Sequence, residues 1–341
     1  MRAVVYETGG VEALQIQEIP DLQPGPGEVL VRVQACAMNH LDVWATKNPA
    51  ERRFGGPRIM GADVAGVVES LGPGAAGFSP GDRVLVSPGT SCRQCQRCQM
   101  GMHSDCTQYK LLGVGLDGGY SELMRIPDTY LTHLPDNISF EDGASIPLVF
   151  ITAWRVLVEK ARVRPGEWVL VNAAGSGVGI AAIQIARLFG ARVITTASTE
   201  VKRGKGLELG AEWAVEYTQP GWPQEVVRLC DGRGADAAID SVGGDTLQKT
   251  LDAMAPGGRV VNCGNTSSGD WNLDLTTLRS RRLWLTSSFM GSNSYLHEVL
   301  KFVETGQIKP VIHEVFPFER VQEAHRAMIN RDNFGKIVLT W

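Results

Sequence analysis

The chain has 341 residues, 43% of them hydrophobic, so it can bury a substantial core, and its length favours two domains over one. Its 33 basic and 37 acidic residues give a net charge of −4, and no basic block or basic–aromatic stripe appears, so the composition does not indicate a nucleic-acid partner. The N-terminus lacks the apolar core of a signal peptide and no apolar run approaches the length of a membrane span, so we expect a cytoplasmic protein with no membrane partner.

Residues 1 to about 130 are rich in glycine and proline and contain short apolar runs of strand length. Three strands are predicted here, at residues 29–35, 64–71 and 84–87, each beside a turn of proline and glycine. Many short strands with such turns are typical of a β-rich domain, and we expect one in this region.

Four of the seven cysteines lie close together in the sequence, at Cys92, Cys95, Cys98 and Cys106. Four thiolates at this spacing can surround one tetrahedral zinc ion and leave no coordination position open for chemistry. Ligand type also allows an iron–sulfur cluster, and reduced cysteines that only happen to cluster are a further alternative. His103 lies in the same loop, where we expect a solvated side chain.

A strand, a glycine-rich turn and a helix follow one another in residues 168–190. Residues 168–173 are an apolar run, after which apolar residues recur at helical spacing until Gly190. Glycines in the turn would let backbone N–H groups approach a pyrophosphate at the positive end of the helix. Ala174 and Ser176 stand where the first two glycines of the dinucleotide fingerprint belong, so an ordinary tight turn is the alternative. The expected cofactor contacts in the turn are Gly175, Ser176, Gly177, Val178 and Gly179.

The sequence after this turn favours the cofactor interpretation. Helical segments separate five more predicted strands, at residues 192–197, 213–217, 235–242, 259–264 and 283–289. Alternation of strands and helices predicts an α/β fold with a parallel, doubly wound sheet.

Together, the cysteine loop, the β-rich N-terminal region and the glycine turn resemble the medium-chain dehydrogenase/reductase superfamily, which includes zinc alcohol dehydrogenases and quinone oxidoreductases. The resemblance covers essentially the whole chain. It implies a GroES-like catalytic domain from residues 1–130 and 290–341, a Rossmann cofactor-binding domain from residues 131–289, and a cofactor cleft at their junction. The four-cysteine loop corresponds to the loop that binds one structural zinc ion in that superfamily.

The resemblance to zinc alcohol dehydrogenases fails at their second, catalytic zinc ion. Asn39, Ala62 and Leu148 stand at the three ligand positions, and none of them is a zinc ligand. A shift of the alignment would offer Cys36 and His40, but nothing nearby replaces the other two ligands. Polarisation of an alcohol by a zinc ion is therefore not expected.

Asn39 and Asp42 resemble instead the zinc-free quinone oxidoreductase branch. The resemblance implies that Asn39 faces the nicotinamide end of the cleft and that Asp42 helps to hold its loop, and these two are the candidate catalytic residues. A helix cap or turn residue is the alternative for Asp42.

The cofactor is expected to be NADP(H) rather than NAD(H). NAD enzymes of this fold place a carboxylate at the end of the second strand, and residues 196–199 contain none. Ser198 with Lys202 can bind a 2′-phosphate, and the resemblance adds Tyr217 and Arg331. The alternative is that this lysine and the arginine after it only form an exposed helix face.

The resemblance also implies contacts at the nicotinamide end of the cofactor. These are a hydrogen bond from Thr152 and backbone contacts from Val242, Gly264 and Phe289. Strand ends contact the cofactor in this fold whatever their side chains.

These features predict an NADPH-dependent reductase that transfers hydride to a small molecule, either a quinone or an α,β-unsaturated carbonyl, without a catalytic zinc ion. A zinc alcohol dehydrogenase-type enzyme and a non-enzymatic NADPH-binding sensor protein are the alternatives. The apolar strand at residues 283–289 is predicted to lie at the edge of the sheet, where it can pair with a second chain, so we expect a homodimer or homotetramer.

Overall fold

The chain divides into two units in a computed structural model that describes residues 1–6, 9–47, 58–267 and 273–341. Unit 1 consists of Met1–Leu148 and Ser292–Trp341, and unit 2 of Val149–Gly291. Residues 131–148, which we expected in the cofactor-binding domain, belong to unit 1. The reason is that β10 (Leu131–His133) pairs with β6 (Arg83–Val86) and helix α3 (Phe140–Ala144) packs on β3 and β5.

Unit 1 is built on a mixed sheet with seven strands in the described part of the chain. Six of them follow the order β10-β6-β5-β3-β18-β17, and β9 pairs with β3. The predicted strands of the N-terminal region correspond to β3, β5 and β6. The bounds of the other strands of this sheet are β3 Glu28–Ala37, β5 Asp63–Leu71, β9 Leu123–Pro127, β17 Ile312–Pro317 and β18 Lys336–Thr340.

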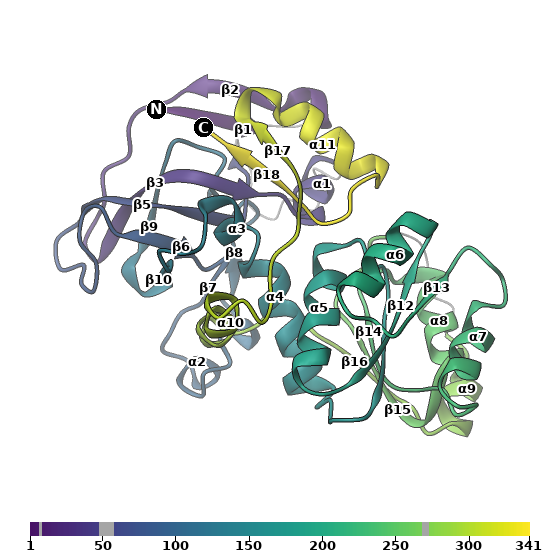
Figure 1. Cartoon of the computed structure of the whole chain (residues 1–341). Helices are drawn as coiled ribbons and strands as arrows, with labels where there is room; N and C mark the ends of the chain where they lie inside the picture. Colours follow the sequence, from purple (N-terminus) through teal and green to yellow (C-terminus); the bar gives the residue numbers. More distant parts are fainter. Residues whose placement is uncertain (7–8, 48–57, 268–272) are drawn as a thin grey trace. The chain divides into compact units, whose positions relative to one another are not determined.

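The C-terminal segment completes this sheet. Strand β18 runs antiparallel to β3, with Val338 opposite Ala37, and parallel to β17 on its other side (Figure 1). Residues from the two ends of the chain therefore share one core, which includes Tyr6, Tyr120 and Phe318. This pairing also brings the first residue of β18 beside the end of β3.

The smaller elements of unit 1 surround this sheet. Its short strands are β1 Arg2–Tyr6, β2 Gln15–Glu18, β4 Arg58–Ile59, β7 Gly89–Thr90 and β8 Lys110–Leu111. Its α-helices besides α3 are α1 His40–Lys47, α2 Gln96–Gln99, α10 Ser294–Glu304 and α11 Val321–Asn330. Its 3-10 turns are η1 Val11–Ala13, η3 His103–Asp105, η4 Asp128–Tyr130 and η6 Phe318–Arg320.

His325 on α11 is fully buried in this core and makes the stability of unit 1 depend on pH. Neither ring nitrogen has a hydrogen-bond partner, and the ring packs edge-on against Tyr120 with centroids 6.1 Å apart. Burial lowers the pKa of His325 to about 3, so in acid the unfolded chain takes up a proton that the folded chain does not. The contribution of neutral His325 to the free energy of unfolding is present above about pH 6.5, the pKa of histidine in the unfolded chain. It is lost as the pH falls below that value.

Because of this histidine, we expect the free energy of unfolding to fall by about 2 kcal/mol between pH 7 and pH 5. Asp42 contributes with the opposite sign, because burial raises its pKa to about 6. The difference between the wild type and His325→Phe isolates the histidine, and denaturant unfolding at the two pH values measures it. An identical pH dependence in both proteins would contradict the expectation.

Unit 2 is a doubly wound α/β domain, as the alternation of strands and helices predicts. Its parallel sheet has the order β13-β12-β11-β14-β15-β16 in the described residues. Figure 1 shows α5 and α6 on one face of this sheet and α7, α8 and α9 on the other. The strands are β11 Trp168–Val171, β12 Arg192–Ala197, β13 Trp213–Glu216, β14 Ala235–Asp240, β15 Met254–Asn262 and β16 Trp284–Ser287. The helices are α5 Gly177–Leu188, α6 Glu200–Glu208, α7 Trp222–Leu229, α8 Gly244–Asp252 and α9 Leu275–Ser280.

Helix α4 (Pro147–Trp154) and a π-helical turn, Arg155–Lys160, lead into this sheet. Every residue of β11 is buried, because a central parallel strand is covered on both faces. Within the described residues, none of the helices is long and apolar enough to cross a membrane.

Candidate functional site

The four cysteines of the predicted metal loop come together in unit 1. Their sulfur atoms lie within 4.8 Å of one another, with Cys92 3.9 Å from Cys98 and 3.5 Å from Cys106. Cys95 lies in the turn before α2, Cys98 lies in α2 itself, and Cys106 follows η3. Among the described residues this is the one group of three or more histidines, cysteines or carboxylates that could hold a metal ion.

Backbone amides donate hydrogen bonds to two of these sulfurs. The N–H of Cys95 donates to the Cys92 sulfur and that of Gln108 to the Cys106 sulfur, each at 3.3 Å. Backbone hydrogen bonds from Gln94 and Cys95 lower the pKa of Cys92 to about 6. Since thiolates are the ligands that zinc prefers, four convergent sulfurs with amide donors fit a closed zinc site.

His103 is half-buried rather than solvated, so that expectation is wrong. Its backbone N–H donates to Ser292 Oγ at 3.1 Å, and burial lowers the pKa of its ring. The hydrogen bond joins the metal loop to Ser292, the residue that begins the C-terminal segment of unit 1.

A second polar cluster is buried in unit 1 where β3, β5 and β18 meet. Lys336 Nζ donates to Asn39 Oδ1 at 2.7 Å and to Asp63 Oδ2 at 3.0 Å. Asn39 Nδ2 donates to the same Asp63 oxygen at 2.9 Å. The exposed fractions of Asn39, Asp63 and Lys336 are 6%, 0% and 4%. A lysine and an aspartate are seldom buried this fully unless they are paired.

Asp42 closes the cluster at the start of α1. Its carboxylate accepts from the backbone N–H of Asn39 at 2.8 Å and of Gly61 at 3.3 Å. Asn39 directly precedes the helix and Asp42 is its third residue, so the carboxylate satisfies a backbone donor just ahead of the first turn. This geometry matches the helix-cap alternative that we raised for Asp42.

The three residues that we aligned with the ligand positions of zinc alcohol dehydrogenases, Asn39, Ala62 and Leu148, lie close to Asp63. Asn39 Nδ2 donates to one oxygen of this carboxylate, and the backbone N–H of Leu148 donates to the other at 2.8 Å. Ala62 is the neighbour of Asp63 in the chain and is fully buried. A carboxamide, a methyl group and an isobutyl group cannot hold zinc, and an ammonium group is bound beside them.

The glycine-rich turn of unit 2 connects β11 to α5. Ser176 caps the helix, because its hydroxyl accepts from the N–H of Gly179 at 2.9 Å and donates to the carbonyl of Ala173 at 2.9 Å. A β-carbon at Gly179 would lie 2.2 Å from the Ala173 carbonyl oxygen, so only glycine fits there. Gly175, Gly177 and Val178 lie in the same turn and at the N-terminus of the helix, where backbone donors face outward.

The end of β12 lies beside the end of β13, with Ala197 opposite Glu216. Ser198 follows β12, and Lys202 is in the first turn of α6. Arg203 is bound to Glu216 at 2.8 Å, and hydrogen bonds from Thr218 and Gln219 lower the pKa of this carboxyl. Tyr217 follows β13 with 39% of its surface exposed. Arg331 belongs to unit 1, at the C-terminus of α11 with a left-handed backbone.

The four residues expected near nicotinamide all lie in unit 2. Thr152 is buried on α4, and Phe289 is exposed after β16. The backbone carbonyl of Val242 accepts from Ser267, and that of Gly264 accepts from the Asn262 side chain at 2.8 Å. These two carbonyls already have partners within unit 2.

The sequence analysis did not single out Asp63 or Lys336 as site residues. A carboxylate at the start of the apolar segment of β5 was the available signal, as was a lysine at the start of the apolar β18. A charge in a buried strand needs a partner, which would have pointed to such a pair.

Comparison with known proteins gives the family of this chain. Residues 25–136 match the family model of the alcohol dehydrogenase GroES-like domain, and residues 177–305 that of the zinc-binding dehydrogenase domain. Human quinone oxidoreductase is 31% identical over 346 residues, which cover 99% of this chain and 97% of that protein. The chain belongs to the medium-chain dehydrogenase/reductase superfamily. It lies in the quinone oxidoreductase-like branch of that superfamily and is an oxidoreductase.

Other members of the superfamily differ in their described activities. Acryloyl-coenzyme A reductase of Sulfurisphaera tokodaii is 29% identical, and the match covers 99% of this chain and 99% of that protein. A solved structure described as an NAD-dependent alcohol dehydrogenase is 47% identical, with a TM-score of 0.97 and full coverage of both chains. A thermostable alcohol dehydrogenase from Pyrobaculum aerophilum, solved with cobalt and zinc, is 29% identical with a TM-score of 0.91 and covers all of this chain and 99% of its own.

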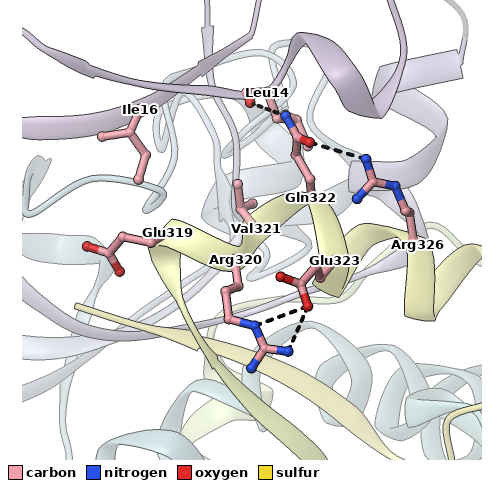
Figure 2. Close-up of a pocket in the computed structure, with 8 residues that line it drawn as sticks. All are labelled: Leu14, Ile16, Glu319, Arg320, Val321, Gln322, Glu323 and Arg326. Atoms are coloured by element: carbon pink, nitrogen blue, oxygen red, sulfur yellow. Dashed lines mark hydrogen bonds and ion pairs between the residues drawn. The ribbon is translucent and has the colours of Figure 1, made fainter.

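A surface pocket of about 420 Å³ lies apart from these clusters, between β2 and the start of α11 (Figure 2). Its charged groups already have partners: Arg320 is paired with Glu323 at 2.7 Å, Arg326 with Glu12 at 2.7 Å, and Glu319 with Arg2 at 2.9 Å. Gln322 donates to the Leu14 carbonyl at 3.1 Å. Because these groups already have partners, we assign no ligand to this pocket.

Proposed function

We propose that this oxidoreductase transfers hydride from NADPH to a quinone or an α,β-unsaturated carbonyl without a catalytic metal ion. The proposal rests on the cluster at Asp63, where Asn39, Ala62 and Leu148 stand at the positions aligned with metal ligands and the ammonium of Lys336 lies beside Asn39. A reductase of activated double bonds needs no metal to polarise an alcohol, because its acceptor is already electrophilic.

The residues have separate roles in this proposal. When bound, NADPH supplies the hydride from its nicotinamide ring. We assign the pyrophosphate to the N-terminus of α5 after Gly175–Gly179, and the nicotinamide end to Thr152, Val242, Gly264 and Phe289. Asn39 would face that end from unit 1, held by the Asp42 carboxylate through its backbone. The protein would chiefly orient the two reactants and exclude water.

We assign the metal loop a structural zinc ion. Four sulfurs within 4.8 Å of one another are enough for one tetrahedral zinc ion, which would leave no position for a substrate. The zinc would therefore contribute to the folding of unit 1 rather than to turnover.

The preference for NADPH is argued from the end of β12. Residues of that strand and Ser198 carry no carboxylate, and Glu216 on the adjacent β13 is already paired with Arg203. Lys202 and Ser198 would bind the 2′-phosphate, with Tyr217 and Arg331 as further contacts. Neutralisation of Glu216 by Arg203 lowers the repulsion that a phosphate would meet there.

A second candidate is an NAD-dependent alcohol dehydrogenase. It is favoured by the 47% identical structure that carries this description. An alcohol dehydrogenase would have to polarise the alcohol by some means other than a zinc ion, because Asn39, Ala62 and Leu148 do not supply three zinc ligands.

A panel of quinones, enones and alcohols, assayed with each of the two cofactors, distinguishes the candidates. We expect oxidation of NADPH with at least one quinone or enone, and slower reaction with NADH. Alcohol oxidation with NAD⁺ and no enone or quinone reduction would support the second candidate instead. Tight binding of NADPH with no turnover of any acceptor would point to a sensor protein.

We also propose assembly through the edge of the unit 2 sheet. Strand β16 ends the sheet, and its Trp284 is 73% exposed. Light scattering should find a dimer or a tetramer, and Trp284→Glu should reduce its mass because it places a charge on the pairing edge. Trp213→Glu, at the opposite end of the same sheet, is the matched control and should change nothing. A monomeric wild type at micromolar concentration would refute the proposal.

A further inference from the structure

Lys336 is a buried charged residue that the proposed reaction leaves without a role. It begins β18, its side chain is 5% exposed, and its ion-pair partner Asp63 is fully buried. The pair joins residues from the two chain segments of unit 1, and it lies beside Asn39, one of the three positions that we aligned with zinc ligands. Burial of both charges is costly, and good hydrogen bonds must offset it.

The ammonium and the carboxylate together fix the orientation of the Asn39 carboxamide. An ammonium group only donates hydrogen bonds and a carboxylate only accepts them. Lys336 must therefore face the amide oxygen and Asp63 the amide nitrogen, as their distances of 2.7 and 2.9 Å require. A flipped amide would place its NH₂ group against the ammonium and its oxygen against the carboxylate.

The remaining polar groups of Asn39 are largely occupied as well. Its backbone N–H is bound to Asp42, and Nδ2 also lies 3.5 Å from the carbonyl of Ala37. An amide oxygen has two lone pairs, and Lys336 takes one. The second lone pair of Oδ1 is the group that Asn39 keeps for a ligand.

We infer that Lys336 is a positioning residue, which locks the Asn39 carboxamide between itself and Asp63 so that one Oδ1 lone pair stays available at the reducing site. The catalytic importance of this lock rests on the proposed function, in which Asn39 faces the nicotinamide. The hydrogen bonds that hold the carboxamide all join residues of unit 1. Loss of the ammonium would remove the donor that holds the amide oxygen, and Asp63 alone would then orient the carboxamide.

The test compares Lys336→Met and Lys336→Arg with Lys301→Met, which removes an exposed lysine from α10. The first readout is the NMR signal of the Asn39 side-chain NH₂ group, assigned with Asn39→Asp. It should shift or split in Lys336→Met, shift less in Lys336→Arg, and stay unchanged in the control. The second is steady-state reduction of a quinone or enone with NADPH. We expect kcat to fall by about 10–100-fold in Lys336→Met, with KM for NADPH nearly unchanged and partial recovery in Lys336→Arg.

A double variant, Lys336→Met with Asp63→Asn, keeps the test decisive if the single variant does not fold, because it leaves no unpaired buried charge. The same shift of the Asn39 signal and the same loss of kcat are expected. An unchanged Asn39 signal, or a wild-type kcat in a folded variant, would overturn the inference. If the wild type reduces no acceptor, the proposed function fails, and the NMR signal alone decides whether Lys336 orients Asn39.

Discussion

The Cys95→Ser variant is expected to lose its zinc ion and to unfold at a temperature about 6–12 °C below that of the wild type. Structural zinc binds small peptide sites with roughly 10–16 kcal/mol, and that free energy stabilises the fold. If the loss of one ligand forfeits about 3 kcal/mol of it, the melting temperature falls by the amount given. Among the residues that the structure describes, no other histidine, cysteine or carboxylate belongs to this group of ligands, so a replacement for the Cys95 sulfur is not at hand.

The control is Cys263→Ser, which changes a cysteine of unit 2 outside the metal loop. It should keep its zinc and its melting temperature. Calorimetry and metal analysis on the same samples measure both quantities. A Cys95→Ser protein that melts like the wild type but has lost the chemical step would show that the metal acts in turnover.

Replacing Lys202 by alanine is expected to weaken NADPH binding by about 10–100-fold and to leave NADH binding almost unchanged. A hydrogen bond to a charged group typically contributes about 1.5–3 kcal/mol, which corresponds to this range. The lysine lies in the first turn of α6 just past the end of β12, and the two cofactors differ there only in the 2′-phosphate. Titrations that follow nicotinamide fluorescence give both affinities.

Lys205→Ala is the matched control, because it removes an exposed positive charge from the same helix. It should change NADPH affinity little. Addition of Ser198→Ala to Lys202→Ala should reduce the remaining preference further, since the two side chains would share the phosphate. Equal losses for both cofactors would mean that Lys202 acts on the fold, and a wild type that prefers NADH would refute the assignment.

The doubly wound sheet of unit 2 could be predicted because each of its strands gives a local signal in the sequence. Strand β12 has the predicted bounds, and β14 lies inside the predicted range, because each is an apolar run between turn residues. Strand β15 begins at Met254 rather than at residue 259, since Pro256 and two glycines resemble a turn although Met254 pairs with Ala235. Only the partner strand reveals that the chain stays extended there.

The polar cluster at Asp63 could not be predicted in the same way. Lys336 is 297 residues from Asn39 and 273 from Asp63, so no local spacing connects them. They meet because β18 pairs with β3, and that pairing depends on the whole sheet of unit 1. The cysteine loop is the opposite case, because its four ligands lie on one short segment and their spacing is visible in the sequence.

Hydride transfer without a catalytic metal ion is tested most directly by the zinc content of protein that is actively reducing a quinone or enone with NADPH. We predict one zinc ion per chain, because the four cysteines can hold one and the groups at Asn39, Ala62 and Leu148 cannot hold another. Two tightly bound zinc ions per chain, with turnover lost when the second is removed, would contradict this account.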